Sequence, residues 1–368
     1  MYFVHPQINL KSVFFSFFKG DNLDALREKL SFYFPKKQVV FTDMGRTAFK
    51  VIIEQLNLKN SEILFPAYTC NIFYPILKQY NIKPIFLEID LKTFQPRDEE
   101  VSRKITPNTK AILVCHTYGL PIDVKKIREV VGERIIIEDC AHSFGAATGN
   151  SGDASLFSLY KHFPSSRGGL LVCPRDWKVE LPKTSFNFRD FISLLNCFSP
   201  FAFLFRKFGQ KIAPKMLRRE KMIKPAAINS VSLSLFSHFF EQYKKGLKNR
   251  IELALFFQEE LKKLGFDLQE SKDNVFCYLS ALVPKNLEKK RDKMVKELRK
   301  YHIFSTRIWH VPIILDKEVQ KEYKIDLNEF PNTIEVAKRI INFPLQSYYT
   351  KKDVKKITNA VRKVIKEI

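Results

Sequence analysis

The feature that most constrains the fold of this chain is an alternation of short apolar runs with stretches of helical spacing. Runs such as AILVC and IIIED are almost continuously apolar, which is typical of parallel strands buried on both faces of a sheet. Helical spacing in Thr47–Leu56 and Val124–Val131 suits βαβ units. We therefore expect an α/β fold with a large, mostly parallel central sheet. Its strands are Val39–Thr42, Glu62–Phe65, Pro84–Ile89, Ala111–His116, Ile135–Glu138, Ala154–Ser158 and Leu170–Cys173.

Composition narrows the class of protein. The 368 residues are 45% hydrophobic and 27% charged, which suits a globular chain with a sizeable core and excludes a disordered or fibrous one. Sixty-two Lys and Arg against thirty-nine Asp and Glu give a net charge of +23. We expect the surface to attract anions, namely phosphorylated metabolites, nucleic acid or an acidic membrane face, and charge alone does not choose among them.

The cysteines and the N-terminal residues indicate a reducing compartment. Six cysteines are scattered without CxxC pairs or a matching His/Cys grid, so we expect neither a disulfide framework nor a metal site. The first residues lack a basic leader and a small-residue cleavage site. The apolar, uncharged run Phe191–Phe205 is shorter than the roughly 20 apolar residues that span a bilayer. We expect a cytoplasmic protein.

The pattern divides the chain into an N-terminal segment (1–38), a large α/β domain (39–240) and a small C-terminal α+β domain (241–368). Within the large domain, residues 175–224 carry twelve Lys/Arg and four Asp/Glu among many phenylalanines, and we expect amphipathic helices there. This insert suits a subunit interface or a lid with solvated lysines. Peripheral contact with the inner face of a membrane is an alternative, while nucleic-acid binding has no signature motif to support it.

Three parts of the sequence match what pyridoxal 5′-phosphate requires from a protein. The cofactor needs a lysine for a Schiff base, a carboxylate beside the pyridine nitrogen and donors for its phosphate. Lys161 follows the strand ASLFS, Asp139 ends the strand IIIED, and Gly45-Arg46-Thr47 joins a strand to a helix. Each feature also has a structural interpretation: a surface lysine, a helix cap and an ordinary turn.

Taken together, these segments resemble the DegT/DnrJ/EryC1/StrS sugar aminotransferases, which are fold-type I enzymes that use pyridoxal phosphate. The resemblance runs from about Val39 to the C-terminus. The blocks that carry it are MGRTAF, FPAYTC, PIFLEID, HTYGLPIDV, IEDCAHSFGA, RGGLLV and INFPLQSYYTKKDVKKITNAVRKVI. It implies a large sheet domain, a smaller C-terminal domain and a homodimer with sites near the subunit interface.

The resemblance also implies roles for individual residues. Lys161, counted back from Gly168-Gly169, matches the Schiff-base lysine, which also moves the proton between Cα and C4′, and Asp139 matches the pyridinium partner. His142 matches a Gln or His near the phenolic oxygen of the cofactor. The remaining cofactor-binding candidates are Gly45, Arg46, Thr47, Cys70 and Ser158, and the weaker substrate candidates are Tyr68, His116, Asn229 and Arg307.

Three departures from the family pattern concern the same site. Counting forward from the strand ASLFS would place the lysine near Phe163 instead of Lys161. Cys70 stands where many members stack an aromatic side chain on the cofactor ring, so that either Tyr68 compensates or the ring is held less tightly. The Asn-x-Arg motif of the interface segment is not evident near Asn229. A divergent member with a remodelled substrate side is therefore expected.

We expect an aminotransferase that moves an amino group, with glutamate as the donor, to a keto-sugar linked to a nucleotide. Polysaccharide or antibiotic amino-sugar synthesis would both use such a product. One alternative is another reaction of the same cofactor, such as sugar dehydration, although the resemblance implies that the dehydratases lack the lysine found at Lys161. A second alternative is a non-catalytic relative that binds a membrane or a partner through its basic insert.

Overall fold

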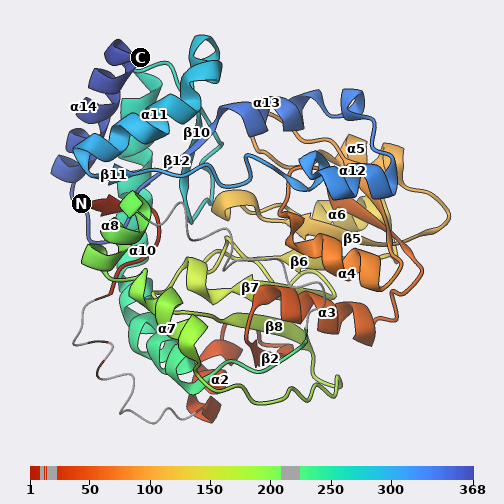
Figure 1. Cartoon of the computed structure of the whole chain (residues 1–368). Helices are drawn as coiled ribbons and strands as arrows, with labels where there is room; N and C mark the ends of the chain where they lie inside the picture. Colours follow the sequence, from red (N-terminus) through yellow and green to blue (C-terminus); the bar gives the residue numbers. More distant parts are fainter. Residues whose placement is uncertain (9–11, 13, 15–22, 209–223) are drawn as a thin grey trace.

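A seven-stranded sheet forms the centre of the computed structural model, which describes residues 1–8, 12, 14, 23–208 and 224–368 (Figure 1). The strand order is β2-β8-β7-β6-β5-β3-β4. Strands β3 to β7 run parallel to their neighbours in that group, whereas β8 is antiparallel to β2 and to β7. The strands are β2 (Lys37–Thr42), β3 (Glu62–Pro66), β4 (Lys83–Leu87), β5 (Thr109–Cys115), β6 (Ile135–Asp139), β7 (Ala154–Ser158) and β8 (Gly169–Pro174). The predicted fold class and all seven predicted strands are confirmed.

Apolar residues fill both faces of this sheet, as the continuous runs predict. Successive side chains of a strand point to opposite faces, and in β3 Ile63 and Phe65 pack in one buried cluster while Leu64 packs in another. One face is covered by α3 (Gly45–Gln55) and α4 (Tyr74–Gln79), and the other by α5 (Asp98–Lys104) and α6 (Val124–Val131). The sheet is therefore a buried layer, and its polar residues gather at the strand ends.

The C-terminal part has its own apolar core. Strands β9 (Asp267–Leu268), β10 (Leu279–Leu282) and β12 (Ile340–Phe343) form an antiparallel sheet in the order β12-β10-β9. Helices α11 (Arg291–Leu298), α13 (Pro331–Arg339) and α14 (Lys351–Glu367) accompany it, with α12 (Lys317–Tyr323) reaching the core of the large sheet. The first strand, β1 (Tyr2–Phe3), pairs with β11 (Ile303–Phe304), so the chain begins beside this C-terminal part.

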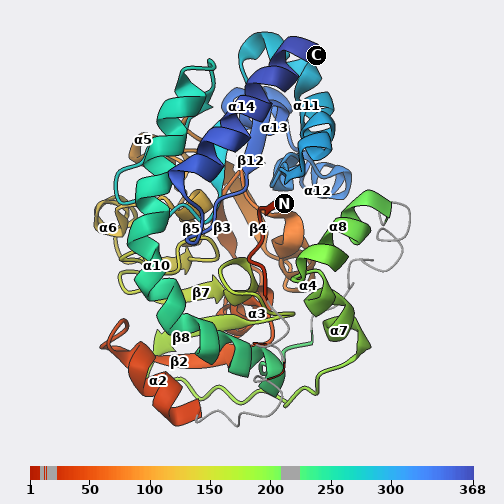
Figure 2. The same cartoon turned by 90° about the vertical axis from the view of Figure 1, so that its left-hand side faces the viewer.

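One long helix, α10 (Ser230–Lys262), joins the two parts, as Figure 2 shows. Its Phe236 and Phe240 pack in a cluster with α2 (Leu23–Ser31) and the β2/β8 side of the large sheet. Its Leu253 and Phe257 pack in the C-terminal core. The domain boundary that the sequence suggests at residue 241 falls inside this helix, because an amphipathic stretch has no composition break where it passes from one core to the next.

Two helices, α7 (Phe188–Leu195) and α8 (Ser199–Phe208), occupy part of the basic insert; residues 209–223 lie outside the described part of the chain. Asn187 and Asp190 begin α7 with reciprocal side-chain caps. The exposed fractions of Phe188 and Phe201 are 70% and 44%. Among the described residues, no helix has the length and apolar character that a bilayer crossing requires.

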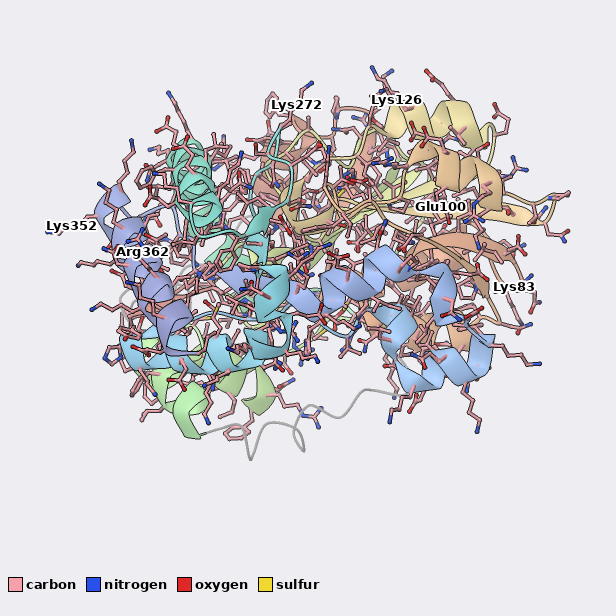
Figure 3. All side chains as sticks on the ribbon, turned by 90° about the horizontal axis from the view of Figure 1, so that it is seen from above. Lys83, Glu100, Lys126, Lys272, Lys352 and Arg362 are labelled. Carbon is pink, nitrogen blue, oxygen red and sulfur yellow. The ribbon has the colours of Figure 1, made fainter. Side chains whose placement is uncertain are left out.

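Charged side chains are distributed over many elements. Lys126 on α6, Lys272, Lys352 on α14 and Lys83 on β4 all lie at the outer edge of the molecule in Figure 3. Lys352 and Lys83 lie at opposite sides in that view, and Lys126 and Lys272 lie along a third edge, so the positive charge at these places is not confined to one patch.

Gly168 and Gly169 let β8 begin directly against the start of α3. A Cβ atom at Gly169 would lie 2.5 Å from the carbonyl carbon of Met44 and 2.6 Å from the amide nitrogen of Gly45. Gly168 has a φ of +137°, which side chains rarely adopt, and its amide donates to the Asp43 carbonyl. Only glycine permits this contact, which fixes the position of the strand-to-helix turn at residues 43–47.

A buried carboxylate, that of Glu138, fixes the end of β6. It accepts hydrogen bonds from His116 Nε2 at 3.0 Å and from the amides of Gly149 and Gly152 at 2.8 and 2.6 Å. Burial alone would raise the pKa of Glu138, but these donors lower it to about 2. His116, Glu138 and Cys140 also have potential metal-ligating atoms within 4.8 Å of one another, and the hydrogen bonds already account for the His116 and Glu138 atoms.

We predict that Gly169→Ala lowers the free energy of unfolding by about 1–3 kcal/mol, because its methyl group would overlap backbone atoms that cannot move aside locally. Urea unfolding at pH 7 measures the effect. Ser102→Ala, at an exposed position of α5, is the matched control and should stay close to wild type. A loss at Gly169 no larger than that of the control would contradict the close contact.

We predict that Glu138→Gln lowers the free energy of unfolding by roughly 3 kcal/mol at pH 7, because the folded pKa lies about 2.5 units below the ordinary value of 4.5. The depressed pKa stabilises the fold above about pH 4.5, and this contribution is lost as the pH falls toward 2. The difference between wild type and variant should therefore shrink between pH 5 and pH 3. Glu129→Gln on α6 is the exposed control, and a pH-independent difference would refute the assignment.

Candidate active site

Asp139 is buried and lies at the carboxyl end of β6. Its Oδ1 accepts a hydrogen bond from the amide of Ala141 at 3.0 Å, and its Oδ2 lies 3.6 Å from the Cys115 thiol. Burial raises the pKa of Asp139, while the positive charge of Lys161 opposes that rise. The carboxylate is thus held in place by one oxygen, and the other oxygen has only a weak thiol donor among these contacts.

Lys161 ends the short 3₁₀ turn η3 (Leu159–Lys161), which follows β7 without a gap. Its Nζ lies 2.9 Å from His142 Nε2. Burial lowers the pKa of Lys161, but interactions with Tyr160 and Asp139 outweigh that effect and raise it above the ordinary value. Burial and the nearby Lys161 charge hold the pKa of His142 well below its ordinary value, so the imidazole is neutral at pH 7.

The alternative lysine position given by the forward count, Phe163, holds no functional group and packs in an apolar cluster against Phe236 at 4.8 Å between ring centroids. Lys161 instead faces both His142 and Asp139. The short connection between β7 and η3 explains the conflict between the two counts, because the turn brings residue 161 into the crevice.

The strand-to-helix turn at Gly45, Arg46 and Thr47 forms the N-terminus of α3. The residue before it, Met44, provides no side-chain cap, so the first amides of the helix are not capped by that side chain. Amides at a helix N-terminus, together with the positive end of the helix dipole, favour an anion. Thr47 donates its hydroxyl hydrogen to Asp43, whose other oxygen lies 3.6 Å from Arg167 Nη1.

Ser158 lies next to this turn. It ends β7 and pairs with Gly169, the residue that contacts the start of α3. A Cβ atom at Gly45 would lie 3.2 Å from the Phe157 carbonyl oxygen, which places α3 directly against the end of β7. The structure therefore brings the turn, Ser158 and the lysine segment into one neighbourhood.

Cys70 and Tyr68 follow β3 on the other side of the crevice. Cys70 precedes the 3₁₀ turn η1 (Asn71–Phe73) and is half-buried, and the Trp309 side chain lies near enough to affect the pKa of its thiol. Burial raises the pKa of the Cys70 thiol, and the charge of Lys161 opposes that rise. The Tyr68 hydroxyl is buried and lies 2.7 Å from the Tyr118 hydroxyl.

Three of the predicted substrate residues have partners of their own. His116 accepts from the Ile122 amide at its Nδ1 and therefore donates from Nε2 to Glu138, which makes it part of the sheet's framework. Asn229 caps α10 by accepting from the amide of Ser232 at 2.8 Å. The Arg307 guanidinium lies 2.5 Å from Asp292 and is about one-third exposed. Of these three, only Arg307 offers a charged group at the surface.

Sequence reasoning did not single out Trp309, which lies beside the site. Its ring centroid is 4.7 Å from that of His142 and 5.6 Å from that of Tyr68. The only sequence signals are that tryptophan occurs twice in the chain and that this one lies two residues after Arg307. Tyr278, 5.3 Å from His142, was also missed.

A large surface groove lies away from this constellation. It has a volume of about 1440 Å³ and is lined by residues such as Arg97, Lys126 and Lys272. None of the candidate site residues lines it. We place the chemistry at the lysine and aspartate because their charges oppose each other in a buried crevice, which the groove does not offer.

Comparison with known proteins finds a family match over nearly the whole chain. The model of the DegT/DnrJ/EryC1/StrS aminotransferase family matches residues 9–362. GDP-perosamine synthase from Vibrio cholerae is 23% identical over 357 residues, covering 94% of this chain and 91% of that protein.

Two solved structures share the fold. E. coli GDP-4-keto-6-deoxy-D-mannose-3-dehydratase with bound hydrated pyridoxal phosphate has a TM-score of 0.75 and 17% identity, and covers 98% of this chain and 100% of that one. The aminotransferase TlmJ from Streptoalloteichus hindustanus has a TM-score of 0.73 and 19% identity, with coverage of 100% and 99%. Pyridoxal phosphate is the cofactor of this family. The match over nearly the whole length shows that the chain belongs to the DegT/DnrJ/EryC1/StrS aminotransferase family.

Proposed function

We propose that this chain uses pyridoxal phosphate to transfer an amino group from glutamate to a keto-sugar linked to a nucleotide. The observation that carries the proposal is the grouping of the partly buried Lys161 with the buried His142 and Asp139 at the ends of β6 and β7. Membership of an aminotransferase family supports the reaction class. The sugar, the donor and the residue roles are the parts that we propose.

The residues present fit the cofactor at three places. Lys161 supplies an amine, and Asp139 supplies a buried carboxylate whose Oδ2 has only the Cys115 thiol as a close donor. The N-terminus of α3, from Gly45 to Thr47, supplies amides for a phosphate, and the neighbouring Ser158 supplies a hydroxyl, whereas the Thr47 hydroxyl already donates to Asp43. When bound, the cofactor provides an electron sink for the carbanion that forms as the substrate Cα loses its proton.

Lys161 is placed to carry that proton. Because His142 is neutral and lies 2.9 Å from Nζ, it can exchange a hydrogen bond with the lysine without adding a second positive charge. A lysine amine within reach of Cα would act as the general base there and would return the proton to C4′ of the cofactor. Asp139 keeps the pyridine nitrogen protonated, since a buried carboxylate stabilises a cation beside it.

The substrate class follows from the relatives and from charge. GDP-perosamine synthase and dTDP-4-amino-4,6-dideoxy-D-glucose transaminase, from Shigella dysenteriae, are both named for nucleotide-linked sugars. A net charge of +23 favours such diphosphates. Arg307, which shares Asp292 with Arg291 and is partly exposed, is the residue that we propose for an anionic group of the substrate.

We predict that Lys161→Ala abolishes the visible band that the wild type forms with pyridoxal phosphate and lowers transamination by about 10²–10⁴-fold, because both the amine and the proton carrier are removed. Borohydride followed by peptide mass analysis should place the pyridoxyl label on residue 161 of the wild type. Lys178→Ala, at an exposed lysine, is the control and should keep the band and the label.

The same experiment separates the alternatives. Keto-sugar substrates with glutamate should yield an amino-sugar and 2-oxoglutarate in equal amounts. A deoxygenated sugar without a new nitrogen would indicate dehydration, the reaction for which a relative 30% identical over 196 residues is named. A wild-type protein with neither band nor label at saturating cofactor would refute the proposal and favour a binding protein.

We also propose a cytoplasmic homodimer, as family membership implies. The insert exposes Phe188, Phe191, Phe201 and Leu204 on α7 and α8, and a second subunit would cover such side chains. Phe188→Ser with Phe201→Ser should weaken the dimer in analytical ultracentrifugation. Unchanged dimerisation combined with a loss of salt-sensitive binding to acidic vesicles would instead assign the insert to a membrane surface.

A further inference from the structure

Trp309 comes from the C-terminal part of the chain, yet its side chain lies among residues of the large sheet. It belongs to the connection between β11 and the 3₁₀ turn η7 (Ile313–Leu315). Its indole lies over His142, at 4.7 Å between centroids and an interplanar angle of 39°, and approaches Tyr118 at 5.4 Å and 31°. These are distances of ring-to-ring contact.

The backbone around Trp309 is firmly held. The Tyr118 hydroxyl donates to the Ile308 carbonyl at 2.6 Å, and the Ile308 amide donates to Asn342 Oδ1 at 2.6 Å. Asn342 and Thr306 also exchange two backbone hydrogen bonds at 2.9 and 3.0 Å. The connection is thus anchored both to the large sheet, through Tyr118, and to β12, through Asn342.

Trp309 has a φ of +59°, which is uncommon for a bulky side chain. Such a conformation persists only where the surroundings enforce it, and it concentrates at functional sites. The hydrogen bonds on either side of the residue supply that enforcement. The backbone conformation therefore fixes the direction in which the indole leaves the chain.

The Cys70 side chain is a neighbour of the Trp309 side chain. Burial raises the pKa of the Cys70 thiol, and Lys161, Asp139 and the Trp309 side chain all lie near enough to the thiol to affect that pKa. A cysteine is too small to cover an aromatic ring, and Tyr68 is engaged with Tyr118 and meets Trp309 edge-on at 80°. Trp309 is thus the aromatic side chain that reaches both Cys70 and His142.

We propose that Trp309 forms the aromatic wall of the cofactor site, covering the pyridine ring across the space that the short side chain at Cys70 leaves open. The inference rests on the proposed function, since it assumes pyridoxal phosphate at Lys161. It assigns to the C-terminal part a binding residue within the cofactor site. Its consequence is that cofactor affinity depends on how the 305–312 connection is anchored to the large sheet.

Tryptophan fluorescence tests the placement directly, because the chain has two tryptophans. Trp177→Phe leaves Trp309 as the only tryptophan. Trp309→Phe leaves Trp177, which is partly buried against the apolar cluster that contains α3 and α4 and accepts a hydrogen bond from Gln38 of β2 at its carbonyl. On titration with pyridoxal phosphate, we expect the emission of Trp309 to be strongly quenched in step with the visible band. The emission of Trp177 should change much less.

Affinity tests the role. Trp309→Ala should weaken cofactor binding by roughly three- to tenfold, the usual worth of one aromatic contact. Trp309→Phe should retain most of the affinity, and Cys70→Phe added to Trp309→Ala should restore part of it. Circular dichroism and urea unfolding of each variant check that the fold is intact, and Trp177→Phe is the matched control.

The outcomes separate the two proposals. If the visible band forms and Trp309→Ala binds the cofactor as tightly as wild type, or the Trp309 emission does not respond, the assignment of the wall is wrong and the proposed function stands. If the wild type forms no band and no borohydride label, the proposed function itself is wrong.

Discussion

The opposition of two charges, the partly buried Lys161 and the buried Asp139, is the constraint on which the proposed site depends. Burying either charge without the other would cost free energy, and each group stabilises the charged form of the other. This requirement sets the ends of β6 and β7 side by side, because Asp139 ends the first strand and η3 follows the second without a loop. The neutral His142 completes the arrangement without adding charge.

The parts of the fold that could be predicted are those in which one local pattern has one physical cause. Continuous apolar runs exist because both faces of the sheet are covered, and so all seven strands of the central sheet were found. The count from Gly168-Gly169 favours position 161, and the position of Gly169 is fixed by backbone contact with Met44 and Gly45. The strand-based count leads to Phe163, which packs in an apolar cluster, because turn length is not encoded by periodicity.

What could not be predicted depends on contacts between distant segments. Trp309 reaches His142 because Asn342 and Tyr118 hydrogen-bond to Ile308, the residue before it. No local sequence pattern predicts those hydrogen bonds. The boundary between the two cores could not be located inside α10 for a similar reason. A helix that is amphipathic throughout does not indicate which core its apolar face contacts.

Asp139 shows how a structural interpretation and a functional one can both hold. Its Oδ1 caps the following turn through the Ala141 amide, which is the local role that a carboxylate after a strand usually has. That bond uses one oxygen and fixes the direction of the carboxylate. The cap therefore orients Oδ2 toward the crevice in advance, and no rotamer has to be ordered when a cation arrives. The local cap and the proposed role beside a cation are therefore compatible, because they use different oxygens of the same carboxylate.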